Sequence, residues 1–227
     1  MDKLESQFTG HLALKVSSRV HDMPDEEKRA AVQEVVDIVE QFRDKVTLRG
    51  AYLVQGFRGD TDLLLWMHGK DIEDVQKLQL RIRKSAFGKV AESSHAFVGM
   101  VRHMEFNKNH IPSFSKGIPP RKYLCFYPFV RSAEWYLLPS IERRALLQEH
   151  GAMGHEFKEI LTNGVHAFGL GEAEWLLSYE TDDLSVFVPM IRRLRDSKSR
   201  LYAKSEGPFI IGRRVELKEA IAEVLYL

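Results

Sequence analysis

The chain contains a single cysteine, Cys125, and almost no excess of charge of either sign. One cysteine excludes an intramolecular disulfide framework and a cysteine-based zinc site, and it fits a reducing compartment. With 33 Lys and Arg against 32 Asp and Glu in 227 residues, the net charge of +1 gives no electrostatic reason to expect nucleic acid or a membrane as partner. No apolar run approaches the ~18 residues of a membrane-spanning helix, and residues 1–10 lack a signal-peptide pattern. We therefore expect a globular cytoplasmic protein.

Motifs of several large enzyme classes are also missing. The sequence has no phosphate-binding loop, no dinucleotide-binding glycine fingerprint, no nucleophile elbow and no metalloprotease helix. These absences exclude the enzymes built on those motifs. They direct attention to residues that are unusual for the helices and strands in which they stand.

The clearest pattern that the sequence does contain is an internal repeat. A shift of 112 residues aligns one stretch of the chain with another without a gap. The matching pairs include Gly59 and Gly171, Leu64 and Leu176, Leu65 and Leu177, Asp71 and Asp183, Arg81 and Arg193, Arg83 and Arg195, and Ser85 and Ser197. So many pairs indicate a duplication, and hence two similar halves.

Each half shows the element order β-α-β-β-α-β, which is the ferredoxin-like motif. The first half predicts strands at 12–18, 46–57, 61–68 and 96–104, and helices at 25–45 and 71–84. The second predicts strands at 123–130, 165–170, 174–180 and 209–214, a helix at 140–162 and another from 183. The proline-containing stretch 107–121 separates them. The predicted fold is α+β, two tandem ferredoxin-like domains (1–112 and 113–227) of the dimeric α+β barrel type, whose sheets either pack or continue into a barrel.

An unusual histidine stands in the predicted helix 140–162. An apolar stripe at helical spacing runs through Leu146, His150, Met153, Phe157 and Leu161. His150 therefore faces inward, next to Gly151 and Gly154, and each glycine costs ~1 kcal/mol in a helix relative to alanine. The missing side chains would let a flat group such as a haem-type ring approach the helix while the imidazole binds its iron. The alternative is a core histidine in a helix whose glycines only mark a bend.

A tyrosine and an arginine mark the predicted strand 123–131. Pro128 cannot donate to a strand ladder, so we expect a sheet edge or a bulge just after Tyr127. Tyr127 and Arg131 lie on one side of a regular strand, where a phenol and a guanidinium could serve a ligand with carboxylates. The alternative is an aromatic core strand that ends in a solvated arginine. The arginine-rich segment 192–195 is typical of a solvated helix face, although it could hold carboxylates.

Several spaced stretches together carry a resemblance to a known family. They are Tyr123–Pro128, Trp135–Pro139, Glu142–Arg144, Glu149–Gly154, Phe168–Gly171 with Glu174–Trp175, and Gly207–Phe209 with Gly212–Arg213. With these residues the chain resembles the chlorite-dismutase-like family and, within it, the coproheme decarboxylase branch that has a distal histidine. The family's fold is two ferredoxin-like domains, and the resemblance implies a homopentamer with the porphyrin site in the C-terminal domain.

The resemblance also implies a reaction and two central residues. His150 matches the proximal histidine that ligates the porphyrin iron, so it is the expected metal ligand. Tyr127 matches the tyrosine whose radical attacks a propionate of iron coproporphyrin III. Hydrogen peroxide is the implied oxidant, and two rounds of decarboxylation give haem b, which makes the implied protein a peroxidase-like oxidoreductase of haem biosynthesis.

Other site residues follow from the same resemblance. His110 falls at the position of the distal histidine that acts as a base towards peroxide. Arg131 takes the place of a lysine found in other branches and is expected to bind and orient the substrate. Trp135 matches a tryptophan near the porphyrin edge, and Ser199 matches a small or hydroxyl residue on the distal side. We also expect Met153, next to the histidine stretch, to contact the porphyrin.

Two departures from the family pattern bear on the substrate. Counted from His150, the distal arginine of chlorite dismutases falls on Asn163, which argues against chlorite. The segment 129–132 reads Phe-Val-Arg-Ser instead of Met-Ser-Lys-Arg, which predicts a different placement of the propionates. The alternatives are a haem-binding peroxidase-like or haem-carrier protein without decarboxylation, a chlorite dismutase, and a ferredoxin-like oligomer without cofactor.

Overall fold

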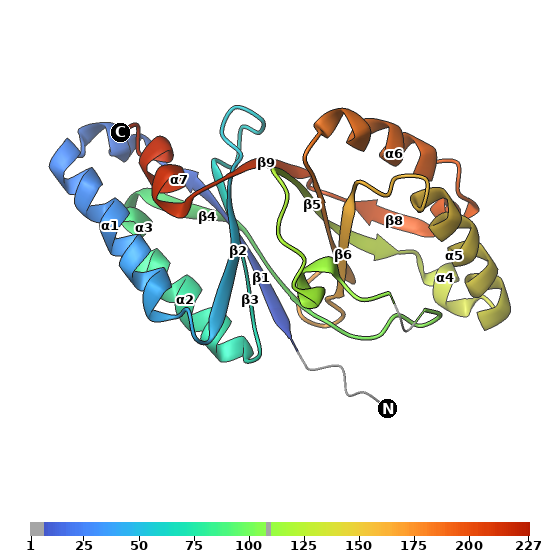
Figure 1. Ribbon diagram of the computed structural model, residues 1–227. Helices are drawn as coiled ribbons and strands as arrows, with labels where there is room; N and C mark the ends of the chain where they lie inside the picture. The colour runs from blue at the N-terminus through green and yellow to red at the C-terminus, as the bar shows by residue number, and fades with distance from the viewer. Residues whose placement is uncertain (1–6, 108–109) are drawn as a thin grey trace. The chain divides into compact units, whose positions relative to one another are not determined.

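A computed structural model describes residues 7–107 and 110–227 (Figure 1). The chain forms two compact units. The first unit contains the residues up to 102 together with 210–227, and the second unit contains His103–Phe209. This division differs from the predicted domains 1–112 and 113–227, because the last strand and helix of the chain belong to the first unit. Within the described ranges no helix has the length and apolarity to cross a membrane.

The first unit is a sheet with helices packed on it. Its strands lie in the order β4-β1-β3-β2-β9. Their bounds are β1 Phe8–Val16, β2 Val46–Leu53, β3 Leu63–Gly69, β4 Ala91–Met100 and β9 Ile210–Val215. The helices are α1 Asp25–Gln41, α2 Ile72–Lys84, α3 Ala86–Val90 and α7 Leu217–Val224, preceded by the 3-10 turn η1 Ser18–Asp22. Alternate strand residues such as Leu63, Leu65 and Met67 meet the apolar faces of these helices in one buried core.

The second unit repeats the pattern with one difference in packing. Its strands lie in the order β8-β5-β7-β6, with bounds β5 Tyr123–Arg131, β6 Leu161–His166, β7 Trp175–Thr181 and β8 Ala203–Glu206. The helices are α4 Ala133–Leu137, α5 Ser140–Gly154 and α6 Phe187–Leu194, and the 3-10 turns are η2 Ser113–Lys116, η3 Leu184–Val186 and η4 Lys198–Tyr202. Whereas α1 buries five residues, α5 buries none.

The strand order confirms the predicted α+β class and tandem ferredoxin-like repeat. In chain order, β1 to β4 and β5 to β8 each form a sheet in which the fourth strand lies beside the first and the third lies beside the second. The predicted strand 209–214 is present as β9, but it belongs to the first unit, where it pairs with β2 and Ala51 lies opposite Val215. The fourth strand of the second unit is β8, which the sequence pattern did not predict.

The helix that carries the unusual histidine is shorter than predicted. α5 ends at Gly154, and the following residues turn before β6 begins at Leu161. The predicted helix to 162 therefore included residues that belong to a turn and a strand. By contrast, α2 begins where predicted, because the Asp71 carboxylate accepts a hydrogen bond of 2.8 Å from the backbone N–H of Glu73.

Candidate functional site

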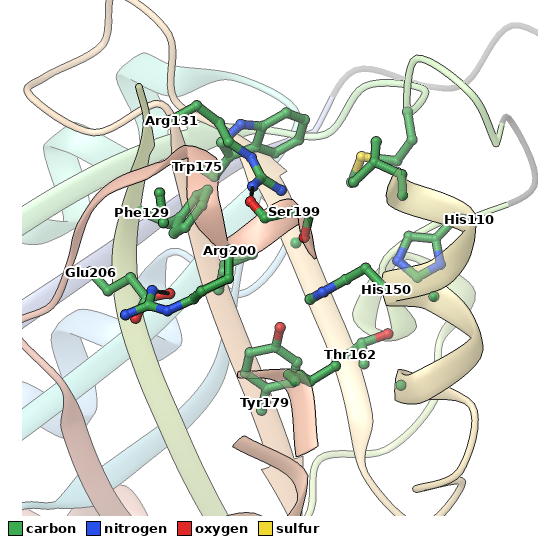
Figure 2. A pocket seen from close by; sticks show the side chains of 18 of the residues that line it. His110, Phe129, Arg131, His150, Thr162, Trp175, Tyr179, Ser199, Arg200 and Glu206 are labelled. Carbon is green, nitrogen blue, oxygen red and sulfur yellow. Dashed lines mark hydrogen bonds and ion pairs between the residues drawn. The ribbon is translucent and has the colours of Figure 1, made fainter. Parts of the chain in front are cut away.

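A cavity of about 710 Å³ lies in the second unit (Figure 2). Its size is in the ~300–1,000 Å³ range typical of small-molecule sites. One face of the sheet contributes alternate residues, which are Tyr127, Phe129 and Arg131 of β5, Thr162, Gly164 and His166 of β6, and Trp175, Leu177 and Tyr179 of β7. α5, α6 and η4 provide further lining residues. The two-residue period of the strands thus gathers aromatic and polar side chains on one surface.

The face of α5 that lines the cavity is nearly bare. Leu147, His150, Gly151 and Gly154 follow one another at helical spacing along it. A Cβ added at either glycine would meet no atom within 4 Å. The helix therefore presents an imidazole beside open space, the arrangement that a flat ligand requires.

Met153 does not line the cavity, contrary to the expectation of a porphyrin contact. The predicted stripe assumed that His150 and Met153 share the centre of one helix face. The residues of α5 that line the cavity are instead Leu147, His150, Gly151 and Gly154, which share one side of the helix. Met153 lies on the other side of His150. Phe157 does line the cavity, from the turn after α5.

His150 extends from α5 into the cavity (Figure 2). Burial lowers its pKa from the ordinary 6.5, and the positive charge of Arg131 lowers it further. The ring is therefore neutral at neutral pH, which is the form that binds metals. Its buried Nδ1 has no hydrogen-bond partner among the residues that the structure describes.

Arg131 is held in place on the sheet side of the cavity. Its Nη1 donates a hydrogen bond of 2.8 Å to the carbonyl oxygen of Ser199. Its guanidinium lies 4.3 Å from the ring centroid of Trp135 and 4.8 Å from that of Phe129. The side chain is thus a pre-oriented cation at the cavity rather than a solvated strand end. Ser199 and Trp135, both buried, also line the cavity, as the resemblance implied for the porphyrin surroundings.

Tyr127 is buried on the same face of β5 as Arg131, as predicted. Its ring stacks on Phe209 at 4.3 Å and on Tyr179 at 6.0 Å between centroids. Burial raises the pKa of Tyr127 well above 10, and the charge of Tyr179 and a hydrogen bond to its hydroxyl raise it further. The phenol is therefore protonated over the whole neutral range, so it can supply a hydrogen atom.

The strand irregularity expected just after Tyr127 lies elsewhere. The pairing of β5 with β7 runs without a shift through Pro128, which lies opposite Leu176. The register shifts between Val130 and Arg131, on the side where β5 pairs with β8. The strand accommodates Pro128 because the proline nitrogen needs no hydrogen-bond partner on the side of β7. On the other side, the pairing of β5 with β8 begins only at Phe129.

His110 also lines the cavity. Burial lowers its pKa from 6.5, and the charges of Lys116 and His155 contribute. A neutral imidazole can accept a proton, as a base towards peroxide requires. The proximity of His155 places His110 near the C-terminal end of α5.

Asn163 lies outside the cavity, although simple counting put it at the position of a distal arginine. Its side chain accepts a hydrogen bond of 2.9 Å from the N–H of Phe114 and donates to Ser178 and Glu180. Thr162, one residue earlier, is on the cavity face of β6. A single-residue difference in loop length inverts the face on which a strand residue lies, so a count from His150 alone does not decide which residue of β6 faces the cavity.

Sequence reasoning missed a second group of polar residues. Arg195, Arg200 and Glu206 line the cavity and pair with one another. Arg195 belongs to the segment that was interpreted as a solvated helix face. The run of arginines alone could not distinguish a solvated helix face from a carboxylate-binding one. The partner Glu206 comes from a strand that the sequence pattern did not predict. Tyr179 was missed because it lies within an otherwise ordinary strand.

Comparisons with known proteins place these features in context. The family described as chlorite dismutase matches residues 28–215 of the chain. A coproheme decarboxylase of Mycolicibacterium smegmatis is 39% identical over 201 residues, which cover 88% of this chain and 87% of that protein. A coproheme decarboxylase of Thermus thermophilus is 26% identical, with 92% and 90% covered.

The fold agrees with solved structures at lower sequence identity. The structure of a chlorite dismutase from Candidatus Nitrospira defluvii in complex with imidazole superposes with a TM-score of 0.88 at 21% identity, covering 99% of this chain and 97% of that chain. At this identity the likeness concerns the fold alone.

Proposed function

The chain belongs to the chlorite dismutase family, and from this premise we propose that it is a coproheme decarboxylase of haem biosynthesis. The substrate is iron coproporphyrin III, the product is haem b and the oxidant is hydrogen peroxide. Identity to the mycobacterial relative over most of both chains supports the enzyme class. The single observation that carries the proposal to the site is one cavity that brings His150, Tyr127 and Arg131 together.

The residues of the cavity fit an iron porphyrin. Open space over Gly151 and Gly154 accommodates a planar ring beside the helix. His150 offers a neutral imidazole to the iron, and its unpaired Nδ1 leaves no competing contact that would turn the ring away. Arg131 supplies a fixed guanidinium for a carboxylate at the ring edge.

The proposed chemistry balances with one peroxide for each propionate. Loss of carbon dioxide from a propionate, with release of one proton and two electrons, leaves a vinyl group. These two electrons, the released proton and a second proton from the solvent reduce hydrogen peroxide to two waters. When bound, the porphyrin iron supplies the site at which peroxide accepts these electrons.

Tyr127 is the residue that acts on the propionate in this proposal. Its protonated phenol loses a proton and an electron to form a neutral radical, which takes a hydrogen atom from the propionate and regains the phenol. The second electron leaves the substrate as the bond to carbon dioxide breaks. Arg131 holds the carboxylate against Tyr127, and the neutral His110 accepts a proton from peroxide.

A titration tests the proposal. Purified protein is titrated with iron coproporphyrin III by absorbance, then treated with hydrogen peroxide, and the porphyrin mass is measured. We expect stoichiometric binding and the loss of two carbon dioxide masses. Binding without mass loss would indicate a haem carrier or peroxidase-like protein, and oxygen release from chlorite would indicate a dismutase. A protein that binds no porphyrin would be a structural module.

Two substitutions assign the roles. His150→Ala should abolish the Soret shift that accompanies iron ligation, whereas the exposed His21→Ala should leave it unchanged. Tyr127→Phe should bind the substrate with unchanged affinity and lose decarboxylation by at least 100-fold. Tyr123→Phe, on the same strand but outside the cavity, is the matched control. Full turnover by Tyr127→Phe would remove the radical role while leaving the binding site intact.

The assembly is part of the same proposal. The family resemblance implies a homopentamer, so light scattering of the purified protein should give about five times the chain mass of 26.2 kDa. A mass of one or two chains would contradict this state.

A further inference from the structure

Two arginines of the cavity converge on one carboxylate. Arg200 Nη1 lies 2.6 Å from Glu206 Oε1, and Arg195 Nη1 lies 2.5 Å from Glu206 Oε2. Each carboxylate oxygen therefore contacts a different guanidinium. All three residues line the cavity that contains His150, and Figure 2 shows Arg200 paired with Glu206 at its wall.

The three side chains come from separate elements. Arg195 follows the last turn of α6, Arg200 lies in η4 and Glu206 ends β8. A carboxylate between two guanidiniums has the geometry by which proteins bind carboxylate ligands, and here the carboxylate belongs to the protein. The structure thus contains a carboxylate-binding subsite in which the chain supplies its own occupant.

The pair is accessible to an incoming ligand. The Arg195 and Arg200 side chains are 37% and 39% exposed, whereas Glu206 is 17% exposed. Ion pairs with exposed partners contribute little net stability, because water screens the charges. A ligand carboxylate that is held nearby by other contacts can therefore replace Glu206 at low cost.

We propose that Glu206 competes with the substrate, filling the Arg195–Arg200 subsite until a porphyrin carboxylate displaces it. The inference rests on the proposed porphyrin binding and adds a residue that sets its affinity. Glu206 then weakens the binding of carboxylate-bearing porphyrins and favours their release. It has no such effect on a porphyrin without carboxylates.

Equilibrium binding tests this without any turnover. The ligands are iron coproporphyrin III and its tetramethyl ester, which keeps the ring and the iron but has no free carboxylate. Each is titrated into the wild-type protein, Glu206→Gln and Glu156→Gln. Glu156 is the matched control, because it pairs with Arg193 at 2.9 Å in the same unit and neither residue lines the cavity. Thermal unfolding of each variant monitors the fold.

We expect Glu206→Gln to bind iron coproporphyrin III about tenfold more tightly than the wild type, with no change for the ester. Glu156→Gln should match the wild type with both ligands. A second variant, Arg195→Gln, should weaken coproporphyrin binding and leave ester binding unchanged, and it decides the matter if Glu206→Gln does not fold. Unchanged or weaker coproporphyrin binding by a folded Glu206→Gln, or equal gains for the ester, would overturn the inference and leave the proposed function standing. Failure of the wild type to bind any porphyrin would overturn both.

Discussion

The phenols of Tyr127 and Tyr179 are neighbours, and Tyr179 raises the pKa of Tyr127. Their rings lie 6.0 Å apart at an angle of 24° between planes, and both line the cavity. Burial raises the pKa of Tyr179 to about 12, so it too is protonated at neutral pH. A hydrogen bond between the two hydroxyls raises the pKa of Tyr127 and fixes the direction of its O–H. Cys125 and Glu206 are the other groups whose charges would act on Tyr127.

Tyr179→Phe should therefore change Tyr127 without removing it. The pKa of Tyr127 should fall towards its ordinary value but stay above 10, because burial is the larger cause. NMR of ¹³Cζ-labelled tyrosine in the porphyrin-free protein measures this titration. Decarboxylation should slow about tenfold with unchanged coproporphyrin affinity, because the phenol is less well aimed.

The control for this variant is Tyr123→Phe, which removes a hydroxyl from β5 outside the cavity. An unaltered Tyr127 resonance in Tyr179→Phe, together with normal turnover, would show that the hydrogen bond has no influence. Loss of porphyrin affinity would instead assign Tyr179 to the binding surface.

At the scale of elements, the cavity exists because α5 lacks the side chains that α1 has. α1 packs Ala31, Val32, Val35 and Ile38 into the core of the first unit. On the side of α5 that lines the cavity stand His150, Gly151 and Gly154, and no residue of α5 is buried. The same fold is thus filled in one unit and hollow in the other, and the difference lies in a few helix positions.

Gly154→Leu should restore a filled interior in the second unit. The space beyond Gly154 is open, so the leucine side chain enters the cavity without a clash. The affinity for iron coproporphyrin III should fall at least tenfold. The free energy of unfolding should rise by about 1 kcal/mol, because glycine is a poor helix former. Absorbance titration and chemical denaturation measure the two effects.

The matched control is Ala152→Leu, which adds a leucine at an exposed position of the same helix. It should leave porphyrin affinity unchanged. If Gly154→Leu bound the porphyrin as tightly as the wild type, the ligand would not use the space beside α5.

Elements with strong local signals were predictable from the sequence, and elements defined by distant pairing were not. Asp71 marks the start of α2 because capping depends on residues two positions apart. β9 could not be assigned to the first unit, because its pairing with β2 joins residues far apart in the chain. Nothing in the local pattern of β9 encodes that partner.

The same distinction applies to the site. Tyr127 and Arg131 were predicted to share a face, since two-residue alternation along one strand is local. The count from His150 that falls on Asn163 could not decide which residue of β6 faces the cavity, because that depends on the length of the turn that follows α5. The pairing of Glu206 with two arginines was not predictable, since it joins three separate elements.

At the scale of the whole molecule, two histidines of the first unit link folding to pH. Burial lowers the pKa of His11 from 6.5 to about 3. Burial, with a contribution from the charge of Arg49, lowers that of His68 to about 4. Above pH 6.5 both are neutral in the folded and the unfolded chain. Below it the unfolded chain binds their protons and the folded chain does not, so acid favours unfolding.

The two lowered histidine pKa values determine how the free energy of unfolding should depend on pH in acid. Between pH 6.5 and about 4 the free energy of unfolding should fall by about 1.4 kcal/mol per pH unit for each of the two histidines. From pH 4 to about 3 only His11 continues to contribute. Urea denaturation at a series of pH values, analysed where the transition is two-state, measures the slope.

His11→Phe separates the histidine contribution from that of other groups that titrate in acid. The His11 ring stacks on Trp66 with 5.1 Å between centroids and 21° between planes, and phenylalanine can keep that contact. The variant should lose about 1.4 kcal/mol per pH unit of the slope between pH 6.5 and 3. The exposed His21→Phe, its control, should keep the wild-type slope. Equal slopes for His11→Phe and the wild type would contradict this prediction. They would mean that His11 is protonated in the folded chain as well, and that carboxylates cause the loss of stability in acid. A reduced slope would show that His11 stays unprotonated in the folded chain over this pH range.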